Sequence, residues 1–153
     1  MNGSTISMYK RDGRSPVPKL EITSRIMRGN RGKNTCPELK LRKALREAGL
    51  PGYRLHWNKA PGRPDISYPG RRIAIFVNGC YWHRCPKCKM SLPKSHSEFW
   101  RIKFDRNVKR DREKAKALTS NGWQVLIIWE CEIDGDIALC IARVRRILEG
   151  KMI

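Results

Sequence analysis

The sequence of residues 73–88 is IAIFVNGCYWHRCPKC, from Ile73 to Cys88. Its first five residues are all apolar, which predicts a strand buried on both faces at the centre of a sheet. The nine residues from Cys80 onward hold three thiols, an imidazole and two adjacent aromatic rings. The central strand therefore leads directly into a loop with candidate metal ligands, a proton-transfer group and flat aromatic surfaces.

Further strands are expected beside this central strand. The prolines of residues 61–64 exclude a helix and lead into an extended segment that carries Asp65. A turn at residues 69–70 joins that segment to the central strand, so we expect a hairpin with Asp65 and Asn78 on neighbouring strands. Two other segments have the apolar character of strands: residues 53–57 and residues 124–130, the second of which is followed directly by Cys131.

Three helices are expected between and after the strands. The first begins with a capping box of Thr35 and Glu38, and the second, residues 95–120, begins with a capping box of Ser95 and Glu98. A final amphipathic helix closes the chain. Helices interleaved with a small, largely buried sheet predict an α/β fold, with a small central mixed sheet flanked by helices.

The long second helix carries a carboxylate on its apolar face. Its apolar residues fall within roughly 100° of one another on a helical wheel, which predicts a buried stripe. Asp111 and Asn107 fall on the same stripe. An ionised carboxylate on a buried face is costly unless it is paired or coordinated, so Asp111 serves either a structural ion pair or a functional site. The apolar members of the stripe are Trp100, Phe104, Val108, Ala115 and Leu118.

The charge of the chain favours a polyanionic partner. Its 153 residues include 33 Lys and Arg against 14 Asp and Glu, and the net charge of +19 is spread along the sequence. Such a field attracts nucleic acid, with a membrane surface as the weaker alternative. Because the chain has no run of about 18 apolar residues and no signal-peptide hydrophobic region, we expect a cytoplasmic protein. Residues 1–22 are expected to be a disordered basic leader, and residues 23–153 a single domain.

The cysteines are better explained as metal ligands than as disulfides, because disulfides are rare in the cytoplasm. Cys85 and Cys88 have the two-residue gap that lets both sulfurs reach one tetrahedral ion. Cys80 and Cys131 are the expected remaining ligands. A set of four protein ligands leaves no open position, so the predicted zinc ion is structural.

Other assignments of these side chains stay open. Cys85 and Cys88 also have the spacing of a thioredoxin-like redox pair, although that motif normally opens a helix and here lies in a loop. His83 or His96 could replace one cysteine as a zinc ligand. The two cysteines outside this set occupy apolar helix positions and are predicted to be inert core thiols: Cys36 and Cys140.

Seven blocks of the sequence form a distinctive pattern: residues 61–65 (PGRPD), 76–83 (FVNGCYWH), 99–100, 106–107, 110–112, 122–123 and 129–131. In order and with compatible spacing, these blocks resemble the very short patch repair (Vsr) DNA mismatch endonucleases. The resemblance implies a restriction-endonuclease-like fold and one structural Zn²⁺. It also implies Mg²⁺-dependent nicking of DNA beside the T of a T·G mispair left by deamination of 5-methylcytosine, which initiates very short patch repair.

Asp65 and His83 are expected to take part directly in catalysis, as a metal ligand and as a general base. Phosphodiester hydrolysis needs a metal ion and a base, and Asp65 at a strand edge is a hard oxygen ligand for Mg²⁺. The resemblance implies that the carbonyl of Val77 completes this shell and that two catalytic Mg²⁺ ions bind. His83 has a reference pKa near neutrality that suits a general base, and Asp111 would orient its ring.

Three weaker candidates complete the predicted catalytic set. The resemblance places Glu38 and Asn107 near the site. It also places Asn78 where relatives often carry Asp or His, and an amide supplies neither negative charge nor a titratable nitrogen. The activity or the metal preference is therefore expected to differ from that of such relatives.

The resemblance also implies how the DNA is bound. Tyr81, Trp82 and Trp100 would insert into the duplex beside the mispair, although Trp100 also lies on the buried stripe. An arm containing Met27 would reach across the minor groove with its basic neighbours Arg25 and Arg28. The expected partner is double-stranded DNA with a T·G mismatch, with a cytosine methyltransferase and mismatch-repair proteins as further partners of a monomeric enzyme.

Two other functions compete with this hypothesis. The first is a zinc-stabilised DNA-binding module in which Asn78 marks the loss of catalysis. The second is a restriction-type nicking endonuclease that keeps the nuclease chemistry but cuts another target.

Overall fold

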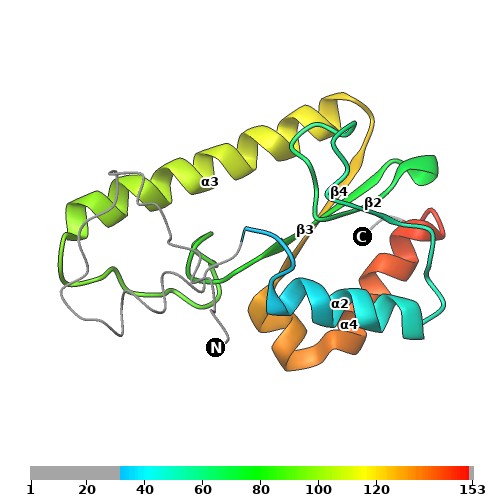
Figure 1. The fold of residues 1–153 in the computed structure, drawn as a ribbon, viewed down its shortest axis with the longest axis horizontal. Coiled ribbons are helices and arrows are strands. Elements are labelled where there is room, and N and C mark those ends of the chain that lie inside the picture. The colour runs from blue at the N-terminus through cyan, green and yellow to red at the C-terminus, as the bar shows by residue number, and fades with distance from the viewer. Residues whose placement is uncertain (1–31, 152–153) are drawn as a thin grey trace, which may run out of the picture. The chain divides into compact units, whose positions relative to one another are not determined.

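A computed structural model describes residues 32–151 of the chain, and from Lys33 onward they belong to one compact unit. The expected leader and the predicted DNA-binding arm with Arg25, Met27 and Arg28 lie outside the described residues. The elements follow the order expected from the sequence (Figure 1). They are α2 (Cys36–Glu47), β1 (Arg54–Leu55), β2 (Ile66–Tyr68), the 3-10 turn η1 (Pro69–Arg71), β3 (Ile73–Asn78), α3 (Ser97–Ser120), β4 (Gln124–Trp129) and α4 (Glu130–Leu148).

The four strands form one mixed sheet in the order β1-β2-β3-β4. β2 and β3 pair antiparallel through the short turn at Pro69–Arg71, which confirms the predicted hairpin. β3 and β4 pair in parallel along their whole length, because the intervening α3 returns the chain to the same end of the sheet. The predicted α/β class with a small central mixed sheet is confirmed.

Helices cover both faces of the sheet, and the central strand is buried between them. Ile73, Ile75 and Val77 face a core that includes residues from α2 and α4. The alternate residues Ala74 and Phe76 face the other side, where Leu118 of α3 packs. Figure 1 shows α3 on one side of the sheet and α2 with α4 on the other. None of the helices among residues 32–151 has the length and apolar character needed to cross a bilayer.

Neither α2 nor α3 begins with the predicted capping box. Thr35 is the N-cap of α2 as expected, but the Glu38 carboxylate accepts the Asn34 backbone N–H instead of reaching back to the N-cap amide. The second capping box, Ser95 with Glu98, is wrong. α3 is capped by His96 in a left-handed conformation (φ 54°), and Glu98 forms an exposed ion pair with Arg101.

Two smaller expectations also need correction. The strand expected over residues 53–57 is limited to Arg54–Leu55, because His56 adopts a positive φ of 45° and leaves the extended conformation. Cys36 is exposed and is therefore not a core thiol, since it lies at the solvent side of the first turn of α2. Cys140 is buried within the core, as predicted.

Candidate active site and metal centre

The loop that follows β3 folds back on itself in tight turns. The backbone N–H of His83 donates to the Gly79 carbonyl at 3.2 Å, and the N–H of Cys85 donates to the Cys80 carbonyl at 2.9 Å. These bonds hold the His83 backbone within one turn of the strand end. Asn78, the last residue of β3, is buried there.

His83 and Asp111 form a close pair between this loop and α3. The distance from His83 Nδ1 to Asp111 Oδ2 is 2.5 Å, and both side chains are partly shielded from solvent. One turn earlier on α3, Asn107 donates from Nδ2 to the Trp82 carbonyl at 3.1 Å. The carboxylate on the apolar stripe therefore has a partner, and α3 fixes the loop at two adjacent points. A neutral imidazole that donates from Nδ1 keeps Nε2 as a proton acceptor.

Asp65 lies directly beside the end of β3. The Val77 backbone N–H donates to Asp65 Oδ2 at 2.8 Å, which confirms that the hairpin brings this carboxylate to the central strand. The turn before Asp65 packs closely on α3, where a Cβ on Gly62 (φ +73°) would lie 2.9 Å from Lys114. Any side chain at position 62 would push the turn away from the helix.

The environment of Asp65 opposes its ionisation. Burial raises the pKa of Asp65 to about 6, and the nearby Glu38 carboxylate also raises it. The Val77 N–H, His56 and Lys114 act in the opposite direction without cancelling the effect of burial. A buried carboxylate whose pKa is raised in this way is typical of a site that receives a cation.

Replacement of Asp65 by Asn is expected to stabilise the metal-free protein at neutral pH. Because the pKa of Asp65 is raised on folding, the folded state binds more protons than the unfolded state between about pH 4 and pH 6, so the unfolding free energy falls as pH rises through that window. Urea unfolding of zinc-loaded protein at pH 7.5 without added Mg²⁺ should show the Asn variant more stable, on the order of 2 kcal/mol, with the difference vanishing toward pH 4. The matched control is exposed Asp105→Asn on α3, and equal stability of the Asp65 variant and wild type would contradict this.

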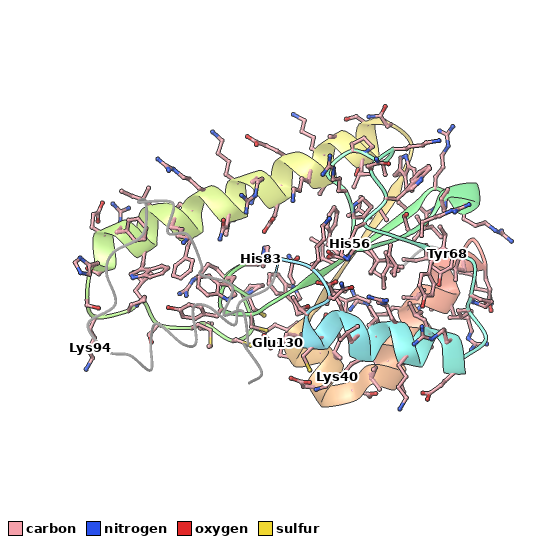
Figure 2. The ribbon with its side chains drawn as sticks, viewed as in Figure 1. Lys40, His56, Tyr68, His83, Lys94 and Glu130 are labelled. Atoms are coloured by element: carbon pink, nitrogen blue, oxygen red, sulfur yellow. The ribbon has the colours of Figure 1, made fainter. Side chains whose placement is uncertain are left out.

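Glu38 and His56 join Asp65 in a compact group, of which Figure 2 labels His56. His56 Nε2 lies 3.4 Å from Glu38 Oε2, and His56 Nδ1 lies 3.7 Å from Asp65 Oδ1. One ligand atom from each residue falls within 4.8 Å of the others, so the group can hold a metal ion. Glu38 was expected near the site, but sequence reasoning missed His56, because no spacing rule links it to residue 65.

The aromatic residues of the loop pack against the first half of α3. The rings of Tyr81 and Trp82 lie 5.2 Å apart, and Trp82 lies 6.1 Å from Trp100. Phe104 contacts Tyr81, Trp82 and Trp100, and it is almost fully buried. Tyr81 and Trp82 keep part of their surface exposed, whereas Trp100 is only 5% exposed and is a core residue of the described chain.

The four predicted zinc ligands come together. The sulfurs of Cys80, Cys85, Cys88 and Cys131 lie within 4.8 Å of one another, and Cys85 Sγ is 3.8 Å from Cys131 Sγ. Zn–S bonds of about 2.3 Å in a tetrahedron give sulfur separations of about 3.8 Å, so the arrangement fits one tetrahedral metal ion. Neither His83 nor His96 is part of this group.

The pKa values of three thiols in this cluster are shifted, and not all in the same direction. Burial raises the pKa of the Cys80 and Cys131 thiols. Burial has the same tendency at Cys85, but backbone N–H groups of Cys88 and Lys87 donate to its sulfur and lower the pKa of that thiol overall. Ligands must lose their protons to bind zinc, so metal uptake releases protons here.

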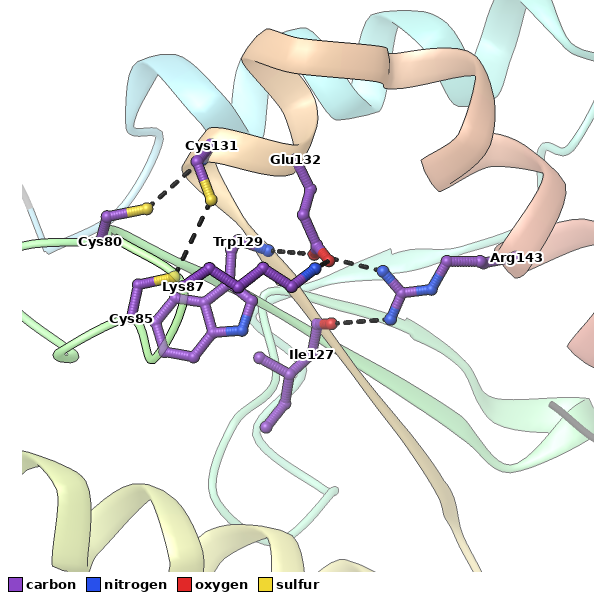
Figure 3. A network of polar contacts seen from close by, with 8 residues as sticks. All are labelled: Cys80, Cys85, Lys87, Ile127, Trp129, Cys131, Glu132 and Arg143. Atoms are coloured by element: carbon purple, nitrogen blue, oxygen red, sulfur yellow. Dashed lines mark hydrogen bonds and ion pairs between the residues drawn. The ribbon is translucent and has the colours of Figure 1, made fainter. Parts of the chain in front are cut away.

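A polar network behind the cluster ties the cysteine loop to α4 (Figure 3). The Glu132 carboxylate accepts from Lys87 Nζ at 2.7 Å, from Arg143 Nη1 at 3.2 Å and from the Trp129 backbone N–H at 2.9 Å. Arg143 also donates to the Ile127 carbonyl on β4 at 3.2 Å. Glu132 follows Cys131 directly, so this network holds the fourth thiol in place. Sequence reasoning missed it, because its members are far apart along the chain.

Sequence comparison identifies a matching family model and several similar proteins. The family model described as DNA mismatch endonuclease Vsr matches residues 19–89. The type II nicking enzyme V.XorIIP of Xanthomonas oryzae pv. oryzae is 42% identical over 125 residues, covering 81% of this chain and 90% of that protein. The type II nicking enzyme V.NaeI of Lentzea aerocolonigenes is 39% identical, covering 78% and 74%. DNA mismatch endonuclease Vsr of Escherichia coli strain K12 is 38% identical over 112 residues, covering 73% and 71%.

These similarities extend beyond the part matched by the family model, and the observed α/β fold agrees with them. The protein acts on DNA as an endonuclease that hydrolyses phosphodiester bonds. The chain belongs to the Vsr endonuclease family.

Proposed function

We propose that the protein nicks one DNA strand beside the T of a T·G mispair by Mg²⁺-dependent hydrolysis, and so initiates very short patch repair. The observation that carries this proposal is the 2.5 Å contact between His83 and Asp111, in a loop that starts where Asp65 meets Val77. The name of the Escherichia coli relative, a DNA mismatch endonuclease, supports a mispair as the target.

Asp65 and the carbonyl of Val77 are the proposed holders of catalytic Mg²⁺, and Glu38 lies close enough to Asp65 to contribute a second carboxylate to the same site. The burial of Asp65 and the nearby Glu38 carboxylate concentrate negative charge, which fits a divalent cation. Bound Mg²⁺ would neutralise phosphate charge and lower the pKa of a water molecule. Asn78 adds no charge, so the carboxylates supply all the side-chain charge of this shell.

His83 is the proposed general base. Its Nε2 accepts a proton from the attacking water as the water oxygen bonds to phosphorus, and the P–O bond to the leaving oxygen then breaks. Asp111 holds the ring by accepting the Nδ1 proton and stabilises the positive charge that develops on the imidazole. Asn107 positions the same loop through the Trp82 carbonyl.

Zn²⁺ at the four cysteines is the proposed structural ion. It would join the loop of Cys80, Cys85 and Cys88 to Cys131 at the start of α4. All four positions of the tetrahedron are filled by thiolates, so this ion is not assigned a catalytic role.

The exposed edges of Tyr81 and Trp82 are proposed to stack beside the mispair. Rings replace lost base stacking worth about 1 to 3 kcal/mol per base, and insertion costs least where pairing is already weak. A hollow beside α3, lined by Arg84, Lys109, Arg112 and Lys116 together with Val108, Asp105 and Glu113, offers four cations to the phosphate backbone.

The substrate proposal is tested with end-labelled duplexes that differ in one base pair. We expect cleavage of one strand at one position in the T·G duplex with Mg²⁺, and nicking at least tenfold slower in T·A, C·G and A·C duplexes of the same sequence. The position of the cut should be adjacent to the T. Equal nicking of the paired duplexes would contradict mismatch recognition and favour a restriction-type target. Tight, salt-sensitive binding with no nicking of any duplex would contradict the catalytic role of the site.

A further inference from the structure

The geometry points to His56 as a third protein ligand of the divalent cation proposed at Asp65 and Glu38, so that the site takes one nitrogen as well as oxygen donors. This inference rests on the metal site of the proposed function and adds a ligand to it. It assigns the protein a preference for Mn²⁺ over Mg²⁺.

The ladder between β1 and β2 places His56 beside Asp65. Leu55 pairs with Ile66 in the antiparallel register, so the next facing pair is His56 and Asp65. The backbone N–H of His56 donates to the Asp65 carbonyl at 3.1 Å and fixes that pairing. His56 has a positive φ and lies just outside the strand, so this hydrogen bond, and not strand alternation, sets the position of its side chain. The main-chain hydrogen bond therefore places the imidazole beside the carboxylate of Asp65.

The imidazole lies between the two carboxylates. Nδ1 is 3.7 Å from Asp65 Oδ1, and Nε2 is 3.4 Å from Glu38 Oε2. Nε2 is buried and makes no hydrogen bond to any of residues 32–151, despite this proximity to Glu38. Buried polar atoms in proteins nearly always form a hydrogen bond, so a buried ring nitrogen without one is unusual. Its lone pair is available to bind a cation.

Glu38 is held so that it can take part. Its Oε2 accepts the Asn34 backbone N–H at 2.9 Å, and its Oε1 accepts the Thr35 hydroxyl at 3.0 Å. Each carboxylate oxygen has a second lone pair, so both can still bind a cation. The side chain is only 4% exposed, and these two bonds from neutral donors fix its direction. A buried carboxylate in this state is stabilised by a bound cation.

The donor set determines which ion fits. Mg²⁺ prefers oxygen ligands in near-ideal octahedral geometry, whereas imidazole nitrogen suits first-row transition metals, and Mn²⁺ is the member of that series that also favours carboxylate oxygens. Two carboxylates and one imidazole therefore suit Mn²⁺ better than the all-oxygen site expected from Asp65 and a backbone carbonyl. The imidazole also adds a titratable nitrogen at the metal, which Asn78 does not supply.

The test uses zinc-loaded protein titrated with MnCl₂ and, separately, with MgCl₂ in a calorimeter. His56→Asn is the main variant, because asparagine tolerates the positive φ at this position. It should lower Mn²⁺ affinity roughly tenfold or more and reduce the ratio of Mn²⁺ to Mg²⁺ affinity. His96→Asn is the matched control, because His96 also has a positive φ but is exposed, and it should leave both affinities unchanged.

Pulsed electron paramagnetic resonance of bound Mn²⁺ gives a readout that needs neither activity nor a stable variant. Wild-type protein should show ¹⁴N modulation from a directly bound imidazole. The modulation should persist in His83→Ala and His96→Asn and disappear in His56→Asn. Bound Mn²⁺ without nitrogen modulation in the wild type, or modulation that persists in a folded His56→Asn variant, would overturn the assignment.

Metal binding and nicking by these variants distinguish a failure of the His56 assignment from a failure of the proposed function. Asp65→Asn should abolish specific Mn²⁺ and Mg²⁺ binding, and retention of both would overturn the metal site itself. If wild-type protein nicks the T·G duplex with Mg²⁺ and Asp65→Asn does not, but Mn²⁺ shows no bound nitrogen, the proposed function stands and the role of His56 is wrong.

Discussion

Replacing His83 by Ala is expected to lower the rate of T·G nicking by roughly 10²- to 10⁴-fold, the usual contribution of a general base. The variant loses the only ring nitrogen that Asp111 orients in the described chain, so water attacks the phosphate without a positioned proton acceptor. The measurement is single-turnover nicking at saturating protein and Mg²⁺. Affinity for the duplex, measured in Ca²⁺, should stay within about threefold, because a base acts in the transition state more than in binding.

Three variants make this prediction specific. His96→Asn removes an exposed imidazole and should nick at the wild-type rate. Asp111→Asn keeps a side chain of similar shape but loses the carboxylate, and it should shift the pH profile of nicking as well as lower the rate. If Asp111→Asn lowers only stability, its role is structural. Undiminished nicking by His83→Ala would remove His83 from the mechanism.

Replacing Cys131 by Ser is expected to cost the protein its tightly held zinc and much of its stability. The thiol is the only one of the four proposed zinc ligands that lies outside residues 80–88, and it would link that loop to α4. Structural zinc contributes on the order of 10 kcal/mol in small zinc-binding peptides, so the loss here should lower the melting temperature by more than about 10 °C. Metal analysis should fall from one zinc per chain toward none.

Cys36→Ser is the matched control for this variant, because Cys36 is an exposed thiol outside the cluster. It should keep one zinc and the wild-type melting temperature. Cys85→Ser should behave like Cys131→Ser, since both sulfurs belong to the same group. Full zinc content in Cys131→Ser with unchanged stability would contradict the four-cysteine site.

The sequence predicted the central part of the fold because its signals are local. The apolar run that became β3, the turn at residues 69–70 and the 24-residue helix α3 each follow from periodicity and turn chemistry. The four cysteines could be grouped from their spacing and from the position of Cys131 at the end of a strand. Asp111 could be singled out because a carboxylate on an apolar helix face requires a partner.

The remaining features depend on contacts that periodicity does not encode. The capping box at Ser95 failed because the preceding loop places His96, not Ser95, at the helix boundary in a left-handed conformation. His56 was missed because its pairing with Asp65 depends on the register of a two-residue strand. The bond of Glu132 with Lys87 joins α4 to the cysteine loop, two segments that only the folded sheet brings together.

The segment between Gly79 and Cys88 divides into three parts in the structure. The thiols point to one cluster, the rings of Tyr81 and Trp82 pack on α3, and His83 turns toward Asp111. Neighbouring residues thus take part in separate groups, because the backbone turns at Gly79 and Cys85 direct successive side chains apart. A structural ion in the cluster would hold the other two groups in place.

The most direct test of a metal-dependent site at Asp65 is single-turnover nicking of the T·G duplex over a Mg²⁺ titration, with wild-type and Asp65→Asn proteins of equal zinc content. Wild type should show a saturable rise in rate, absent in EDTA. Asp65→Asn should show no detectable nicking at any Mg²⁺ concentration while it binds the duplex as tightly and unfolds no more easily than wild type. Nicking by Asp65→Asn near the wild-type rate at the same Mg²⁺ concentrations would contradict the account.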